Sequence, residues 1–113
     1  MIVRYSDVAI EDLTQVWSDV FTASCDVPTA DKYTDGIFET IDKESLFPLS
    51  GVQIFYRGNP TGIRMIPFKA YLIFYRVKND IMEVGRILPA KSDYLRLLFD
   101  EESGTVLMED GGV

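Results

Sequence analysis

The sequence predicts an α+β fold in which an N-terminal helical hairpin packs on a small antiparallel sheet. Between residues 10 and 41, apolar residues recur at three- and four-residue spacing, which is typical of amphipathic helices. Two runs rich in β-branched and aromatic residues, 70–78 and 81–88, are joined by only two residues, which is typical of a β-hairpin. The expected order of elements is β-α-α-β-β-β-α.

The hairpin sets the register of the two central strands. Asn79 and Asp80 tolerate the positive φ angles of a type I′ turn. This turn places Arg76 opposite Glu83, a cross-strand ion pair that stabilises the register by roughly 0.2–1 kcal/mol. Continued without a break, the register predicts one face with Tyr71, Ile73, Tyr75, Val77, Met82, Val84, Arg86 and Leu88, and another with Leu72, Phe74, Arg76, Lys78, Ile81, Glu83, Gly85 and Ile87. We expect the helices to cover the first face and a C-terminal helix or a partner segment to cover the second.

The N-terminal part of the chain predicts a short strand and a first helix. Residues 2–5 alternate weakly, as in a strand, and Ser6 or Asp7 can cap the helix that follows. The chain should break at residues 23–27. The first helix then has one apolar stripe, made of Ile10, Leu13, Val16, Trp17, Val20 and Phe21.

The second helix should begin near Pro28, because a missing N–H costs nothing in a first turn, and end near Leu46. Gly36 lies inside this helix at a cost of roughly 1 kcal/mol relative to alanine, so we expect a close approach to the first helix there. The next five residues, Phe47-Pro48-Leu49-Ser50-Gly51, stop the helix and turn the chain toward the sheet.

The remaining elements are shorter. We expect a strand or irregular extension at residues 52–57, a turn at 58–60, and a further strand at 62–67. Ser92 or Asp93 can start a short helix that contains Tyr94, Leu95, Leu98 and Phe99. Residues 1–99 are expected as a single domain. Residues 100–113 form an acidic tail, in which 105–108 is either an extra edge strand or disordered.

Composition excludes several classes of protein. No apolar run is long enough to span a membrane, and the N-terminus lacks the apolar core of a signal peptide, so we expect a cytoplasmic protein. Cys25, the lone cysteine, cannot form an internal disulfide, and without a histidine to activate it we expect a packed or merely exposed thiol. With no histidine, zinc motif, phosphate loop or nucleotide fingerprint, we expect no metal and no cofactor.

Charge is distributed unevenly along the chain. The net charge is −7 over residues 1–56, +5 over 57–96 and −5 over 97–113. A local basic band can bind phosphates or an acidic partner, although the same side chains can also simply solvate exposed strands. No sequence-specific binding of nucleic acid is expected.

Three segments carry a resemblance to a known family: DKYTDGIFETIDKESLFPLSG, GIRMIPFKAYLIFYRV and MEVGRILPAKSDYLRLL. In their order and spacing, residues 2–99 resemble the RelE/ParE toxin superfamily of bacterial type II toxin–antitoxin systems. The resemblance implies a growth-inhibiting toxin, of the kind that stabilises plasmids, held inactive by a cognate antitoxin. ParE-like members act on DNA gyrase by binding, whereas RelE-like members are ribosome-dependent mRNA endonucleases.

The residues favour the ParE-like branch. RelE-like nucleases carry an arginine after the tyrosine that opens the central strand, but here Leu72 follows Tyr71. If the chain were a nuclease, its catalytic residues would be Arg64, Lys91 and Tyr94, which are few for a reaction that needs a base and several cations. The sequence therefore favours a toxin without catalytic residues.

The same comparison gives candidate contact residues for a target or an antitoxin: Arg64, Lys69, Arg86, Lys91 and Tyr94. The alternative for each is a solvated cation or, for Tyr94, a packed helix aromatic. A further alternative is a harmless homologue that only binds a regulatory protein. All these hypotheses predict an apolar surface that needs a partner.

Overall fold

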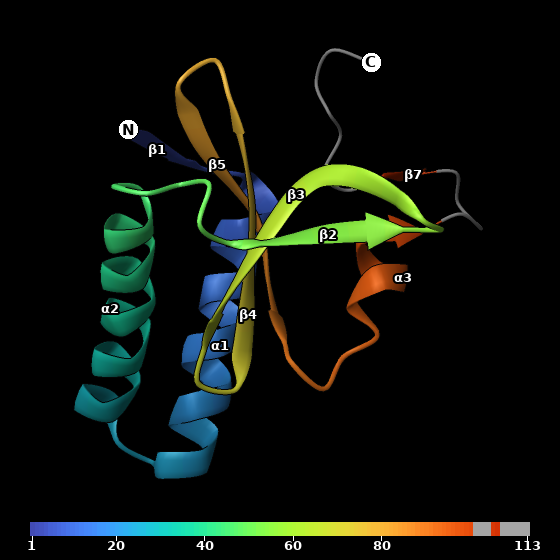
Figure 1. Cartoon of the computed structure of the whole chain (residues 1–113). Coiled ribbons are helices and arrows are strands. Elements are labelled where there is room, and N and C mark those ends of the chain that lie inside the picture. The colour runs from blue at the N-terminus through green and yellow to red at the C-terminus, as the bar shows by residue number, and fades with distance from the viewer. Residues whose placement is uncertain (101–104, 107–113) are drawn as a thin grey trace.

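The computed structural model describes residues 1–100 and 105–106 (Figure 1). Two long helices lie side by side on one face of a five-stranded sheet, and a short third helix lies on the other face. In chain order the elements are β1 (Ile2–Tyr5), α1 (Asp7–Ser24), α2 (Val27–Glu44), β2 (Val52–Tyr56), β3 (Asn59–Phe68), β4 (Tyr71–Lys78), β5 (Ile81–Pro89), α3 (Tyr94–Leu98), β6 (Phe99–Asp100) and β7 (Thr105–Val106).

The strand order in the main sheet is β1-β5-β4-β3-β2. Strands β2 to β5 form an antiparallel meander, and β1 pairs in parallel with β5, which makes the sheet mixed. The predicted α+β architecture, a helical hairpin on a small sheet, is confirmed, but the sheet is mixed rather than antiparallel, and four strands lie between α2 and α3 where the expected order had three. The parallel pairing places the start of α1 directly beside β5.

The predicted hairpin between β4 and β5 is confirmed. Asn79 and Asp80 have φ angles of 53° and 62°, as a type I′ turn requires. Arg76 pairs with Glu83 in the register, and an Arg76 nitrogen lies 3.4 Å from a Glu83 carboxylate oxygen. A second turn, at Arg57-Gly58, also has two positive φ angles and joins β2 to β3. The turn predicted at 58–60 thus lies at 57–58, and the strand predicted to begin at residue 62 already begins at Asn59, which pairs with β2.

The predicted register is wrong beyond Val84, because β5 contains a bulge. Tyr75 pairs with Val84, but Phe74 pairs with Arg86, so Gly85 is an extra residue without a partner on β4. An inserted residue reverses the face of every side chain beyond it. Ile87 therefore packs in the core beneath the helices, and Leu88 packs on the opposite face with Phe74.

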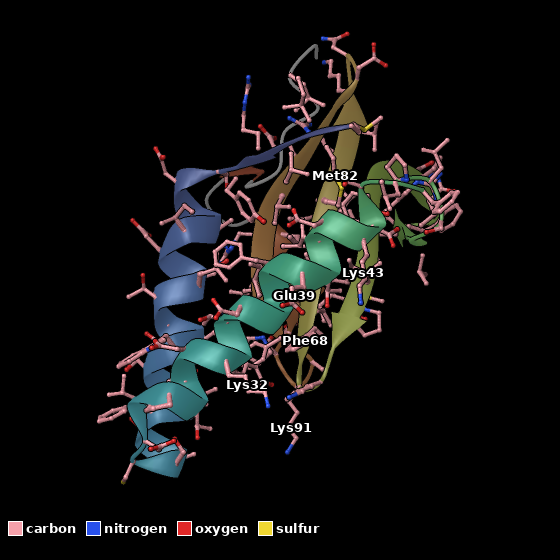
Figure 2. All side chains as sticks on the ribbon, turned by 90° about the vertical axis from the view of Figure 1, so that its left-hand side faces the viewer. Lys32, Glu39, Lys43, Phe68, Met82 and Lys91 are labelled. Carbon is pink, nitrogen blue, oxygen red and sulfur yellow. The ribbon has the colours of Figure 1, made fainter. Side chains whose placement is uncertain are left out.

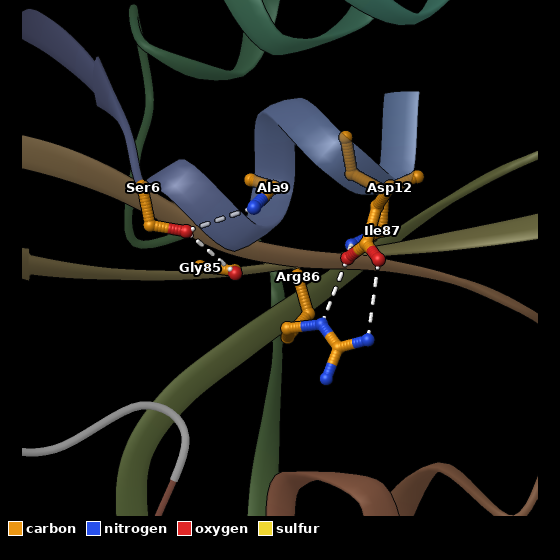
Figure 3. A network of polar contacts seen from close by, with 6 residues as sticks. All are labelled: Ser6, Ala9, Asp12, Gly85, Arg86 and Ile87. Carbon is orange, nitrogen blue, oxygen red and sulfur yellow. Dashed lines mark hydrogen bonds and ion pairs between the residues drawn. The ribbon is translucent and has the colours of Figure 1, made fainter. Parts of the chain in front are cut away.

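The helix starts follow from local capping. The Ser6 hydroxyl accepts a hydrogen bond from the Ala9 N–H at 3.0 Å, and it donates to the Gly85 carbonyl at 2.8 Å (Figure 3). One side chain thus caps α1 and attaches it to the bulge of β5. Asp26 caps α2, and Pro28 occupies its first turn as predicted. This helix ends at Glu44, two residues before the predicted end.

Two apolar cores lie on the two faces of the sheet. The core beneath the helices contains Ala9, Leu13, Val16, Ile37, Ile41, Ile66, Tyr71, Ile73, Tyr75, Met82, Val84 and Ile87. The core on the opposite face contains Ile54, Ile63, Phe74, Leu88, Leu98 and Phe99. The two long helices thus cover one face and α3 packs on the other, as expected, but with the side chains of β5 beyond Val84 on the faces opposite to those predicted.

The predicted reason for Gly36 is wrong. A Cβ atom at this position would lie 2.6 Å from Cζ of Phe68, so the glycine admits a ring from β3 rather than the first helix. The Phe68 ring also packs edge-on against Tyr33 of α2, with ring centroids 5.4 Å apart. This glycine therefore permits close contact between α2 and the sheet.

The C-terminal part departs partly from the prediction. The helix α3 ends at Leu98, and Phe99 begins a short strand that pairs with β7. Of the predicted extra strand at 105–108, Thr105 and Val106 pair with β6 rather than with an edge of the main sheet, and residues 107 and 108 lie outside the described residues. Within the described part of the chain, no helix is long and apolar enough to cross a membrane.

Candidate functional site: an apolar bend held by buried hydrogen bonds

The segment between α2 and β2, residues 45–51, presents large apolar side chains to water. Leu46, Phe47 and Leu49 are 70%, 73% and 66% exposed. Single exposed apolar residues are ordinary, but three within four positions of one loop form a patch that is typical of interaction sites. We call residues 46–51 the apolar bend.

The bend is held from beneath by the hydroxyl of Tyr75, a residue of β4 that is fully buried. This hydroxyl lies 2.6 Å from a carboxylate oxygen of Glu44 and 2.7 Å from the Pro48 carbonyl, and it accepts the Gly51 N–H at 3.2 Å. The same Glu44 oxygen accepts a hydrogen bond from the Ser50 hydroxyl at 2.8 Å. One phenol therefore joins the end of α2 to both halves of the bend.

Burial, followed by the hydrogen bond to the Glu44 carboxylate and its charge, raises the pKa of Tyr75 well above its ordinary value. The hydroxyl therefore keeps its proton at any physiological pH, and it can serve as a permanent donor and acceptor beneath the bend. A Cβ atom at Gly51 would overlap this hydroxyl, so glycine is needed where the bend passes over Tyr75.

Arg64 of β3 fixes the bend from the side. Its Nη1 atom donates to the carbonyls of Leu49 and Gly51, each at 3.0 Å. The bend is thus tied to β3 and to β4, and its exposed side chains project from a backbone that is held at several points. A preordered apolar surface loses less conformational entropy on binding than a free loop does.

The apolar surface extends beyond the bend. Together with Met1, Val77 and Asp80, the bend lines an open hollow of about 530 Å³. On β2, the strand that follows the bend, Val52 and Phe55 are 58% and 55% exposed. A hollow of this volume is large enough to receive apolar side chains of a partner protein.

The structure places Arg86 in an internal ion pair. Its Nε atom lies 2.8 Å from one carboxylate oxygen of Asp12 and a terminal nitrogen lies 3.1 Å from the other (Figure 3). Asp12 also accepts the Ile87 N–H at 2.9 Å, on the part of β5 that extends past its pairing with β1. The arginine therefore joins α1 to the sheet.

Lys69 and Lys91 lie at one end of the molecule. The Ala90 N–H donates to the Ala70 carbonyl at 2.8 Å, which brings the loop after β5 to the turn between β3 and β4. The Lys69 ammonium lies 4.9 Å from the centre of the Tyr33 ring. Lys91 is exposed and projects from this end of the molecule (Figure 2).

Tyr94 packs on the opposite face of the sheet from Arg64. Its ring centroid lies 5.4 Å from that of Phe74, in the core beneath α3. Arg64 pairs in register with Tyr75, whose side chain faces the two long helices. The five predicted contact residues therefore do not form one site; of them, the structure brings only Lys69 and Lys91 together.

Sequence reasoning missed the role of the bend. The sequence predicts that residues 47–51 stop the helix and turn the chain toward the sheet, but it does not predict that Phe47 and Leu49 stay in water. The signal that was available is a proline and a glycine flanking an apolar residue, with a tyrosine on a buried strand to satisfy the backbone. The Cys25 thiol is exposed, which is one of the two environments that we expected for it. The Cys25 backbone is left-handed and caps the C-terminal end of α1.

Comparisons with known proteins agree with this architecture. The sequence model described as "ParE toxin of type II toxin-antitoxin system, parDE" matches residues 3–94. A search of curated protein sequences gave no match. Among solved structures, the chain is similar to a chain of the "Chromosomal ParDE TA system from P. aeruginosa", with a TM-score of 0.67 and 17% identity over 80% of this chain and 97% of that one. The chain belongs to the ParE toxin family of type II toxin–antitoxin systems.

Proposed function

We propose that this chain is a toxin that inhibits DNA gyrase by binding it, and that a cognate antitoxin neutralises it in the cytoplasm. Family membership supports the toxin role and the existence of an antitoxin. The observation that carries the binding mode is the apolar bend, with Leu46, Phe47 and Leu49 exposed by 66–73% on an ordered backbone.

Exposed apolar surface of this kind is favourable only when a partner covers it. Binding hot spots are typically apolar or aromatic anchors in a desolvated centre, and a preordered anchor loses little entropy on binding. The bend combines such anchors with a neighbouring hollow of about 530 Å³. A partner can therefore both receive the bend and fill the hollow.

A nuclease mechanism has less support. Cleavage of RNA needs a base and several cations around one phosphate. Arg64 is engaged by two carbonyls of the bend on the helix side of the sheet, whereas Tyr94 packs on the other side. The chain contains no histidine that could serve as the base. These features favour a toxin that acts by binding.

The test is a gyrase cleavage assay with purified protein and supercoiled plasmid. We expect the wild-type protein to stabilise a gyrase–DNA cleavage complex. The double variant Phe47→Ser/Leu49→Ser should need at least about tenfold more protein for the same effect, which corresponds to about 1.4 kcal/mol of lost binding free energy. The matched control is Ile10→Ser, which removes a 48% exposed apolar residue from α1, away from the bend.

Three outcomes would overturn the proposal. The gyrase target is wrong if micromolar wild-type protein gives no cleavage complex. Cuts in mRNA within the ribosome, lost on Lys91→Ala, would instead indicate an endonuclease. A folded protein that causes no growth arrest when expressed without its antitoxin would indicate a harmless homologue.

A further inference from the structure

Arg64 belongs to a row of side chains that crosses three strands beside the apolar bend. It pairs in register with Gln53 of β2 on one side and with Tyr75 of β4 on the other. Side chains of direct partners in neighbouring strands lie on the same face of a sheet. Arg64 and Tyr75 therefore contact the bend from the same face, next to each other.

These two side chains bind the carbonyl groups of the bend. The Tyr75 hydroxyl lies 2.7 Å from the Pro48 carbonyl oxygen. Nη1 of Arg64 donates to the carbonyls of Leu49 and Gly51, each at 3.0 Å. A guanidinium Nη atom carries two hydrogens, so both hydrogens of Nη1 are used within the chain. A carbonyl that loses such a donor must bond to water instead, which favours other conformations of the loop.

The arginine holds the backbone on both sides of Ser50, and this affects both exposed anchors of the bend. The Leu49 carbonyl belongs to a residue whose side chain is 66% exposed, so the direction of that side chain depends on the hydrogen bond to Arg64. Phe47 is connected through Ser50, whose N–H donates to the Phe47 carbonyl at 3.0 Å. One guanidinium group thus restrains the backbone that carries Phe47 and Leu49.

We infer that Arg64 is a positioning residue: it holds the bend in the conformation that presents Phe47 and Leu49, and it raises the affinity for a partner through them. Anchors that are ordered before binding lose less conformational entropy in the complex. The effect on gyrase affinity rests on the proposed function, whereas the ordering of the bend does not. The sequence placed Arg64 among the cations that contact a partner, so the inference gives this residue a different role.

The first test is amide hydrogen exchange of the isotope-labelled full chain, measured by NMR. The variant Arg64→Gln has a shorter side chain without the guanidinium group. In this variant, we expect the Ser50 and Gly51 amides to exchange at least about fivefold faster than in the wild type. The acceleration should exceed that of the Ile73 amide in the central strand β4, which reports opening of the buried core.

The matched control is Arg96→Gln, which removes an exposed arginine from α3 on the opposite face of the sheet. It should change the exchange of the bend amides by less than about twofold, because surface substitutions have small effects. Equal effects of the two substitutions on the bend, or equal acceleration of the bend and of Ile73 in Arg64→Gln, would overturn the inference.

The second test separates positioning from direct contact by a cycle of gyrase affinities. Arg64→Gln alone should weaken binding by about fivefold or more, and Arg96→Gln by less than about twofold. Added to Phe47→Ser/Leu49→Ser, Arg64→Gln should cause less than about twofold further loss, because the anchors it positions are already removed.

The outcomes of the two tests are distinct. Losses that multiply fully in the cycle would show that Arg64 contacts gyrase itself, and would overturn the positioning role. If the wild-type protein binds no gyrase, the proposed function fails, and hydrogen exchange alone then decides whether Arg64 orders the bend.

Discussion

At the scale of single residues, the Tyr75 hydroxyl connects groups that are 24 to 31 positions away in the sequence. It satisfies backbone groups of the bend that would otherwise need water, while the side chains of the bend remain outside. A buried polar group that satisfies several partners is costly to remove, because each partner is left without its hydrogen bond.

Tyr75→Phe should therefore lower the free energy of unfolding by about 1.5–3 kcal/mol, the usual range for hydrogen bonds that involve a charged group. Urea denaturation of the two proteins measures the difference. The contact between the Tyr75 ring and the core is retained in the variant, so a change below 0.5 kcal/mol would mean that the hydroxyl does not stabilise the bend.

Gly51→Ala should also be destabilising, since its Cβ atom would overlap the Tyr75 hydroxyl. The two changes should not be additive, because removing the hydroxyl in Tyr75→Phe removes the closest overlap. Denaturation of both single variants and the double variant forms the cycle. Strictly additive free energies would contradict the proposed contact.

At the scale of elements, α1 is attached to β5 by two side chains, one from its N-cap residue and one from its second turn. Ser6 donates to Gly85 on the bulge, and Asp12 accepts the Ile87 N–H and pairs with Arg86. The side chains of Asp12 and Arg86 are both only 13% exposed, so their ion pair is screened less than a surface pair would be.

Asp12→Asn should lower the free energy of unfolding by about 2–3 kcal/mol, because Arg86 keeps its charge with a weakened partner. Glu11→Gln, which removes a neighbouring exposed carboxylate on the same helix, is the matched control and should change stability by less than about 0.5 kcal/mol. Equal effects of the two substitutions would show that net charge, rather than this ion pair, matters. In an Arg86→Gln background, the effect of Asp12→Asn should become smaller.

The elements themselves could largely be predicted from the sequence, because their signals are local. The type I′ turn at Asn79-Asp80, the Ser6 cap and the apolar stripe of α1 all depend on residues within a few positions of one another. The bulge at Gly85 was missed, although a glycine inside a strand is a known signal for one. Because of this one extra residue, Arg86 lies on the face of the sheet opposite to the predicted one.

The candidate site could be predicted far less well. Exposure of Phe47 depends on whether another element covers it, and no local pattern determines this. Likewise, the partner of Arg64 lies in a loop 13 to 15 residues earlier in the chain, and it becomes evident only once β3 is placed beside the bend. Family resemblance supplied basic residues as candidates and predicted an apolar surface for a partner, whereas the structure adds the exposed apolar side chains of the bend.

At the scale of the whole molecule, two tyrosines, the partly buried Tyr5 and the buried Tyr71, connect stability to alkaline pH. Burial and the charge of Asp42 raise the pKa of Tyr5 to about 12, and burial and the Asp19 carboxylate raise that of Tyr71 to about 12. The unfolded chain loses these protons near pH 10, but the folded protein retains them to about pH 12. Raising the pH through this window therefore favours unfolding.

We expect the free energy of unfolding to fall between pH 10 and pH 12, and to fall less steeply in Tyr71→Phe. Urea denaturation at several pH values measures both slopes. Comparing slopes removes any constant loss of stability that the substitution itself causes. An unchanged slope in Tyr71→Phe would mean that this tyrosine titrates alike in the folded and unfolded chains.

The most direct measurement is the equilibrium affinity of the purified protein for purified gyrase, with the wild type, Phe47→Ser/Leu49→Ser and Ile10→Ser compared by isothermal titration calorimetry. If the apolar bend is the contact surface, the wild type and Ile10→Ser should bind alike, and the double variant should bind at least about tenfold more weakly while remaining folded. Equal affinity of all three proteins, or no binding by any of them, would contradict a toxin that engages gyrase through residues 46–51.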